Sequence, residues 1–493
     1  MNDSYKKEFI KDNLITLIAH AIISLKGFVV MPLIIKFVGI KIYGSTILIQ
    51  SMIAFIFGIS SIGVGIKMKR YLPSAKGKEE KRNIFYKQFY FRLIIMLIII
   101  NLWYFFFDII NSAIFKNEIQ YSFGIIPVFL ITYFLYSQGG DYFRYTSGIS
   151  KMSIMGITFP VIYIVVLFFL AIKNSITINS IITAQSVSAL LVVIPAFIII
   201  LKEIGIKWVI FYRNIISEIK IGFPLVLNFI MDFILVGIDR YVIAIFLSVA
   251  AVGNYNVGYQ LGSFIILLPK AMGTVLPQLM SKAVDANKGY QAIIMANNSI
   301  KFFLILAIPF VFGSIILGIP IMDLLANEKV ASKAVLVLPI VALGTLFYGL
   351  FMILSDVLFV HLKTKQIFRA NLIASIFNLI ANVILLYYFR SIIVAAITTF
   401  ISYLIAFLYI RRTVDRLWKI DYQSSVIFKS IAASFVMSIL LFFVYTAYDP
   451  MSSVWILLGE VLFSITVYFL MLFVLKTFSD SEINTIKQFF RFA

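Results

Sequence analysis

Runs of about 20 apolar residues, separated by short polar segments, recur along the whole chain. A helix of that length crosses the hydrocarbon core of a bilayer, which is about 30 Å thick. The pattern therefore predicts an all-α polytopic membrane protein with about 14 transmembrane helices. The predicted spans are 13–38, 42–66, 90–110, 121–138, 153–172, 180–201, 221–247, 251–280, 299–322, 335–360, 370–389, 391–410, 425–447 and 452–475.

Lysine and arginine are unevenly distributed between the two sets of connections. If the N-terminus is cytoplasmic, the even-numbered connections carry most of the basic residues, with the largest cluster in 67–89. Because cytoplasmic loops are enriched in Lys and Arg, we predict that both termini lie in the cytoplasm. The cluster in 67–89 is either an orientation signal or a contact surface for anionic lipid headgroups.

The composition supports this class and excludes others. The chain is 62% hydrophobic and 13% charged, whereas a soluble domain carries about 25% charged residues. The cytoplasmic basic residues account for the formal net charge of +20, so we expect no nucleic-acid partner. With no cysteine, only two histidines and no P-loop, we expect no catalytic residue, no metal site and no cofactor.

A weak internal repeat relates the two halves of the chain. An offset of 209 superposes Phe37 on Phe246, Ile40 on Val249 and Gly44 on Gly253. This offset aligns the first span with the seventh, so the two copies would have the same orientation, as in parallel-repeat transporters. We predict two six-helix lobes around a central cavity, at 1–205 and 206–415. The remainder, 416–493, would add two helices and a cytoplasmic tail.

Charged residues inside the predicted spans are the main functional signal. Each costs about 3 kcal/mol at the bilayer centre, so they must face a wet cavity or one another. The candidate cavity residues are Lys26, Lys270, Asp232, Asp239, Arg240 and Asp356.

Two interpretations of these charged residues remain open. Lys26 and Lys270 lie in different predicted lobes, and together they would make a cationic chamber suited to an anionic headgroup. Asp239 and Arg240 are equally well explained as ion pairs that join the lobes. The aspartates are also candidates for coupling to proton or sodium antiport.

Some uncharged polar residues are weaker candidates for sugar contact. Tyr255 and Tyr259 lie one helical turn apart, near the predicted outer mouth. Asn371, Asn378 and Asn382 share one helical face, where hydrogen bonds between helices compete with a sugar-binding role for Asn378.

The segment DRYVIAIFLSVAAVGNYNVGYQLGSFIILLPKAMGTVLPQL resembles the corresponding segment of bacterial polysaccharide repeat-unit flippases, the exporters of O-antigen and capsule units. They belong to a superfamily that also includes the multidrug extruders and the lipid II flippase. The matching positions are Asp239, Arg240, Ile243, Phe246, Leu247, Val252, Gly253, Tyr255, Leu268, Pro269 and Pro277, whereas Ser248 and Gly258 depart from the family pattern.

The resemblance implies a function as well as a fold. It implies alternating access and a cargo of undecaprenyl-pyrophosphate-linked oligosaccharide, moved from the cytoplasmic to the outer leaflet. Membrane lipids, a polysaccharide polymerase and a chain-length regulator are the expected partners. One alternative is a cation-coupled multidrug exporter, against which the cationic Lys26 and Lys270 argue. Another is a polymerase or ligase, which would need a large external loop that the pattern does not provide.

Overall fold

The chain folds into helices and connecting turns. A computed structural model describes residues 22–23, 25–60, 64–117, 121–146, 148–208, 215–448 and 453–478, and these ranges contain no strand. Residues 25–38 are helical. The other helices are α2 (Ile40–Ser60), α3 (Val64–Tyr71), α4 (Lys78–Phe115), α5 (Ile125–Tyr145), α6 (Ile149–Ile172), α7 (Ile178–Ile204), α8 (Ile215–Phe246), α9 (Val249–Gly262), α10 (Leu267–Asp285), α11 (Gly289–Leu325), α12 (Glu328–Ala334), α13 (Val337–Val360), α14 (Thr364–Phe389), α15 (Ile392–Val414), α16 (Ser424–Ala447) and α17 (Val454–Val474), with a 3₁₀ turn, η1 (Phe264–Ile266).

The prediction of an all-α, multi-span membrane protein is confirmed. Within the described ranges, 11 helices are long and apolar enough to cross a membrane. The histidine at position 20 lies outside the described residues.

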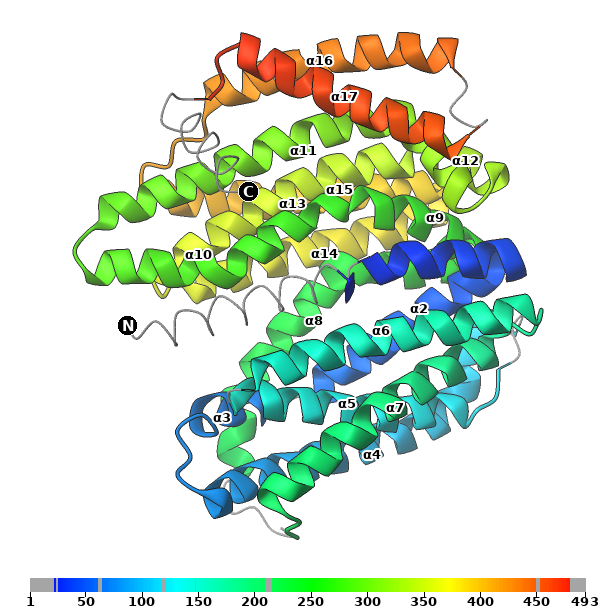
Figure 1. The fold of residues 1–493 in the computed structure, drawn as a ribbon, viewed down its shortest axis with the longest axis vertical. Coiled ribbons are helices and arrows are strands. Elements are labelled where there is room, and N and C mark those ends of the chain that lie inside the picture. The colour runs from blue at the N-terminus through cyan, green and yellow to red at the C-terminus, as the bar shows by residue number, and fades with distance from the viewer. Residues whose placement is uncertain are drawn as a thin grey trace. The chain divides into compact units, whose positions relative to one another are not determined.

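The chain divides into two compact units. Unit 1 comprises residues 1–233 and 243–253, and unit 2 comprises residues 234–242 and 254–493. In unit 1, α7 packs against α5 and α6. In unit 2, α13 packs against α10, α11 and α15, and α16 and α17 cover α11 (Figure 1). The division at 205/206 and 415/416 into repeated lobes stays a prediction.

Two helices are much longer than their apolar runs. α4 and α11 contain 38 and 37 residues, so the predicted loop 67–89 is instead α3 followed by the first turns of α4. Hydropathy detects only the part of a helix in hydrocarbon, whereas these helices continue into polar surroundings. Their starts differ by 211 positions (289 − 78) and their ends by 210 (325 − 115), close to the offset of 209 seen in the sequence.

The ends of two other spans follow from local interactions. α5 continues past Gly139 and Gly140 to Tyr145, so its predicted end at 138 is wrong. A Cβ at Gly139 would lie 3.4 Å from the Met155 side chain, which shows how closely the helices pack there. The turn near 390 is confirmed. The backbone of Arg390 has the left-handed helical conformation, and the Ser391 hydroxyl caps α15 by accepting a hydrogen bond from the Ile393 N–H.

The predicted eighth span is broken. α9 ends at Gly262, η1 follows, and α10 begins at Leu267. Pro269 lies in the first turn of α10, where its missing N–H leaves no intrahelical bond unmade. The Thr345 hydroxyl of α13 donates to the Gly262 carbonyl at 2.9 Å. This bond satisfies a backbone group near the break, as spanning helices require.

Candidate functional site

A buried carboxylate on α8 is the centre of a polar cluster in unit 2. Asp239 has 0% of its surface exposed. Its Oδ1 accepts a hydrogen bond from Asn382 Nδ2 at 2.8 Å. Its Oδ2 accepts from the Tyr255 hydroxyl at 2.8 Å and from the Thr399 hydroxyl at 2.6 Å. These three donors are neutral, so the charge of the carboxylate is stabilised by dipoles from α9, α14 and α15.

The cluster extends along α14 and α15. Asn382 Nδ2 also approaches Asn378 Oδ1 at 3.1 Å, and the Thr398 hydroxyl donates to Asn382 Oδ1 at 2.8 Å. Asn378, Asn382 and Thr398 are fully buried. Asn382 therefore makes hydrogen bonds to α8 and α15, whereas Asn378 bonds to Asn382 within α14. Their contact with a sugar stays a prediction.

Tyrosines and an arginine form the next layer of the cluster. The Tyr259 and Tyr403 hydroxyls lie 3.0 Å apart. The Arg240 guanidinium lies 4.6 Å from the Tyr259 ring centroid, and its Nε donates to Asn256 Oδ1 at 2.9 Å. Tyr255 is 0% and Tyr259 5% exposed. In this conformation both rings are enclosed by protein, so sugar stacking on them would require the cluster to open.

The Asp239 cluster has the chemistry of a small-cation or proton site. It presents a carboxylate, amide oxygens and hydroxyl oxygens, which are the ligands that hard cations prefer. The described residues contain no group of three His, Cys, Asp or Glu that could hold a metal ion. With one carboxylate, neutral donors around it and the Arg240 guanidinium in the next layer, the cluster suits a monovalent ion or a proton better than a tightly held divalent metal.

Asp356 lies close to α10, the helix that carries Lys270, in unit 2. Lys270 is exposed on α10, directly after the break. A Cβ placed on Gly273, one turn further along α10, would lie 3.6 Å from Asp356 Oδ2. An acid from α13 thus faces the α10 backbone within a turn of the lysine. The sequence could not reveal this proximity because the two residues are 86 positions apart (356 − 270).

Lys26 lies against aromatic rings in unit 1. Its Nζ is 5.7 Å from the Phe159 ring centroid and 5.8 Å from that of Tyr163, both on α6. Ring faces attract a cation and partly offset its loss of water. Asp232, on α8, is half-buried in the same unit. Lys26 and Lys270 belong to different units, and the cationic chamber between them stays a prediction.

Arg92 and Asp141 form a buried charge cluster in unit 1 that the sequence analysis did not identify. Arg92 on α4 is 5% exposed, and its Nη1 lies 3.2 Å from Asp141 Oδ2 on α5. The Gln138 amide, turned with its oxygen toward the guanidinium, lies 2.7 Å from the same nitrogen. The signal was present in the sequence, since Arg92 and Asp141 both border apolar runs, but nothing local showed that they pair.

The family model for polysaccharide biosynthesis proteins matches residues 9–284, more than half of the chain. The chain belongs to the polysaccharide biosynthesis protein family. A second family model, MatE, matches residues 224–384. No curated protein sequence matches this member of the family.

Solved structures show the same fold. The lipid II flippase MurJ in an inward closed conformation has a TM-score of 0.75 and 19% identity, covering 94% of this chain and 98% of its own. An inward-facing multidrug resistance MATE family transporter gives a TM-score of 0.62 at 13% identity, covering 82% and 99%. A MOP superfamily transporter from Pyrococcus furiosus has a TM-score of 0.55 and 13% sequence identity. The match covers 84% of this chain and 96% of that transporter.

These findings confirm the predicted exporter superfamily. The chain is a multi-pass membrane protein of the polysaccharide biosynthesis protein family, and it has the fold of solved flippases and transporters.

Proposed function

We propose that this family member is a flippase for an undecaprenyl-pyrophosphate-linked oligosaccharide repeat unit of an O-antigen or capsule. It moves the unit from the cytoplasmic to the outer leaflet of the bacterial inner membrane by alternating access. Both termini lie in the cytoplasm, and a polysaccharide polymerase and a chain-length regulator use the delivered unit.

The observation that carries this proposal is Lys26. A cation on a membrane-spanning helix, held against Phe159 and Tyr163, would bind the pyrophosphate while the rings exclude water. Lys270, exposed after a helix break, supplies a second cation in the other unit. The membrane potential favours the outward direction, because each negative charge leaving a negative interior gains about 2.3 kcal/mol per 100 mV.

The test uses a strain that needs this gene for its surface polysaccharide. It is complemented with Lys26→Gln, Lys270→Gln, and the charge-preserving controls Lys26→Arg and Lys270→Arg. We expect each Gln variant to reduce surface polysaccharide at least about tenfold, as loss of a charge-assisted contact implies, and to accumulate lipid-linked units inside. The Arg variants should retain most function. Normal polysaccharide in both Gln variants, at equal protein level, would refute the proposal.

We further propose that the Asp239 cluster binds the coupling ion, a proton or a monovalent cation. Support comes from its fully buried charge and its neutral oxygen-bearing partners on three other helices. In proteoliposomes loaded with labelled lipid-linked oligosaccharide, an imposed sodium or pH gradient should drive flipping by wild type and not by Asp239→Asn. Gradient-independent flipping by wild type would contradict this role.

Drug export is the second candidate, because the MatE model matches residues 224–384. Expression in a drug-sensitive host should leave the inhibitory concentrations of cationic dyes unchanged if the cargo is anionic. A consistent increase that depends on Asp239 would favour drug export.

A further inference from the structure

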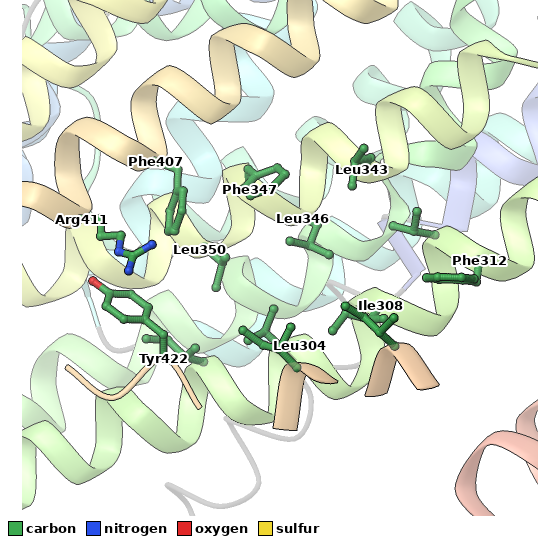
Figure 2. A pocket seen from close by; sticks show the side chains of 14 residues that line it. Leu304, Ile308, Phe312, Leu343, Leu346, Phe347, Leu350, Phe407, Arg411 and Tyr422 are labelled. Carbon is green, nitrogen blue, oxygen red and sulfur yellow. The ribbon is translucent and has the colours of Figure 1, made fainter. Parts of the chain in front are cut away.

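Unit 2 contains an apolar cavity of about 330 Å³ among α11, α13, α15 and the first turns of α16. Apart from Arg411 and Tyr422 at one end, every side chain that lines it is a hydrocarbon or an aromatic ring (Figure 2). Native interiors leave few voids larger than a water molecule, and an apolar void is a poor place for water. A hydrocarbon ligand would restore the missing contacts.

The cavity has about the length of one bilayer leaflet. Its lining on α11 runs from Ile300 to Phe312, thirteen residues whose ends are about 18 Å apart along the helix. Half of a hydrocarbon core is about 15 Å. Two lining residues, Leu343 and Ile431, are 37% and 41% exposed, so the cavity opens at the surface of unit 2. A lipid chain could therefore enter sideways without crossing the protein.

The polar end of the cavity is basic. Arg411, in the last turn of α15, lies 4.4 Å from the Tyr422 ring centroid, with its Nε 3.7 Å from Asp415 Oδ2. The ion pair is half-exposed and therefore weak. The segment 411–419 holds four basic residues and one acidic residue, a net charge of +3 (4 − 1). This charge matches an anionic headgroup, and Arg411 can offer its terminal N–H groups to a phosphate.

We infer that this cavity binds one acyl chain of an anionic glycerophospholipid from the cytoplasmic leaflet, with the lipid phosphate at Arg411. The lipid is a resident of the protein and is distinct from the cargo. The inference holds whether or not the proposed flippase activity is correct, because it rests on the shape and charge of unit 2 and on the proposed orientation, which places Arg411 on the cytoplasmic side.

The test is native mass spectrometry of the full-length, delipidated protein after addition of phosphatidylglycerol, phosphatidylethanolamine or undecaprenyl phosphate. The variants are Leu346→Trp, which fills the cavity, and Arg411→Gln, which removes its charge. The matched controls are Arg412→Gln, the adjacent charge outside the lining, and Leu458→Trp, an exposed position on α17.

We expect wild type and both controls to retain one phosphatidylglycerol, with about tenfold weaker retention of phosphatidylethanolamine. Arg411→Gln should lose about tenfold in phosphatidylglycerol retention, and Leu346→Trp should retain none. If Leu346→Trp does not fold, Leu343→Phe at the cavity mouth replaces it. Equal retention by all variants would overturn the inference, as would displacement of phosphatidylglycerol by undecaprenyl phosphate, which would make the cavity a cargo site.

Discussion

Replacing Asp239 by asparagine is the sharpest test of the polar cluster in unit 2. The change keeps the shape of the side chain and removes its charge. Two donors converge on Oδ2 and one on Oδ1, so the introduced amide can accept at only one of these positions. With its nitrogen at the Oδ1 position, it faces the Asn382 amide nitrogen, and one buried donor loses its acceptor.

The expected cost follows from that count. One unsatisfied buried donor is worth about 1–3 kcal/mol, so the variant should fold but unfold at a lower temperature in detergent. Transport should fall much further than stability, because no charge remains to bind a proton or cation. The exposed Asp108→Asn on α4 controls for expression and handling.

A second variant separates coupling from packing. Adding Asn382→Asp to Asp239→Asn returns one negative charge to the cluster at a neighbouring position. We expect it to recover stability and part of the gradient-driven flipping. The single substitution Asp232→Asn, seven residues earlier on α8, tests the other aspartate on that helix that could bind the coupling ion. Full gradient-driven flipping by Asp239→Asn would refute the reasoning.

Three further predictions concern other parts of the fold. Asp141→Asn leaves the buried guanidinium of Arg92 without its counter-charge and should destabilise the protein by about 3–5 kcal/mol, measured as a lower unfolding temperature; adding Arg92→Gln should recover part of this, and no recovery would argue against the pair. Gly262→Ala places a Cβ 2.6 Å from a backbone oxygen of α13 and should cost about 1–3 kcal/mol, whereas Gly313→Ala, with open space around it, should be tolerated. Burial lowers the pKa of His361, at the end of α13, below its ordinary value of 6.5; the unfolded chain then binds more protons, so thermal stability should fall as pH drops below about 6.5 in wild type and less in His361→Gln.

Much of the span pattern could be predicted from the sequence, because an apolar segment must be about 20 residues long to cross the bilayer as a helix. The shared face of Asn378 and Asn382 was also readable, since helical spacing alone determines it. The Asp239 cluster was not. Its partners Tyr255, Asn382 and Thr399 lie 16, 143 and 160 residues away, and nothing local encodes which helix faces which.

The break in the predicted eighth span shows a different limit. Hydropathy shows 251–280 as one continuous apolar run, and a proline such as Pro269 indicates at most a bend in a spanning helix. The interruption depends on the close approach of α13 at Gly262 and on the hydroxyl of Thr345. Both are tertiary contacts, so a single sequence without its partners in space could not specify them.

That break has a mechanical consequence. An unbroken helix must give up backbone hydrogen bonds to change its tilt, whereas α9 and α10 already meet at a joint where the Gly262 carbonyl accepts from Thr345. The two halves also carry different chemistry, with Tyr255, which donates to Asp239, on one side of the joint and Lys270 on the other. We expect the joint to act as a hinge, so that α10, which carries Lys270, can change its tilt while α9, which covers the buried carboxylate, stays in place.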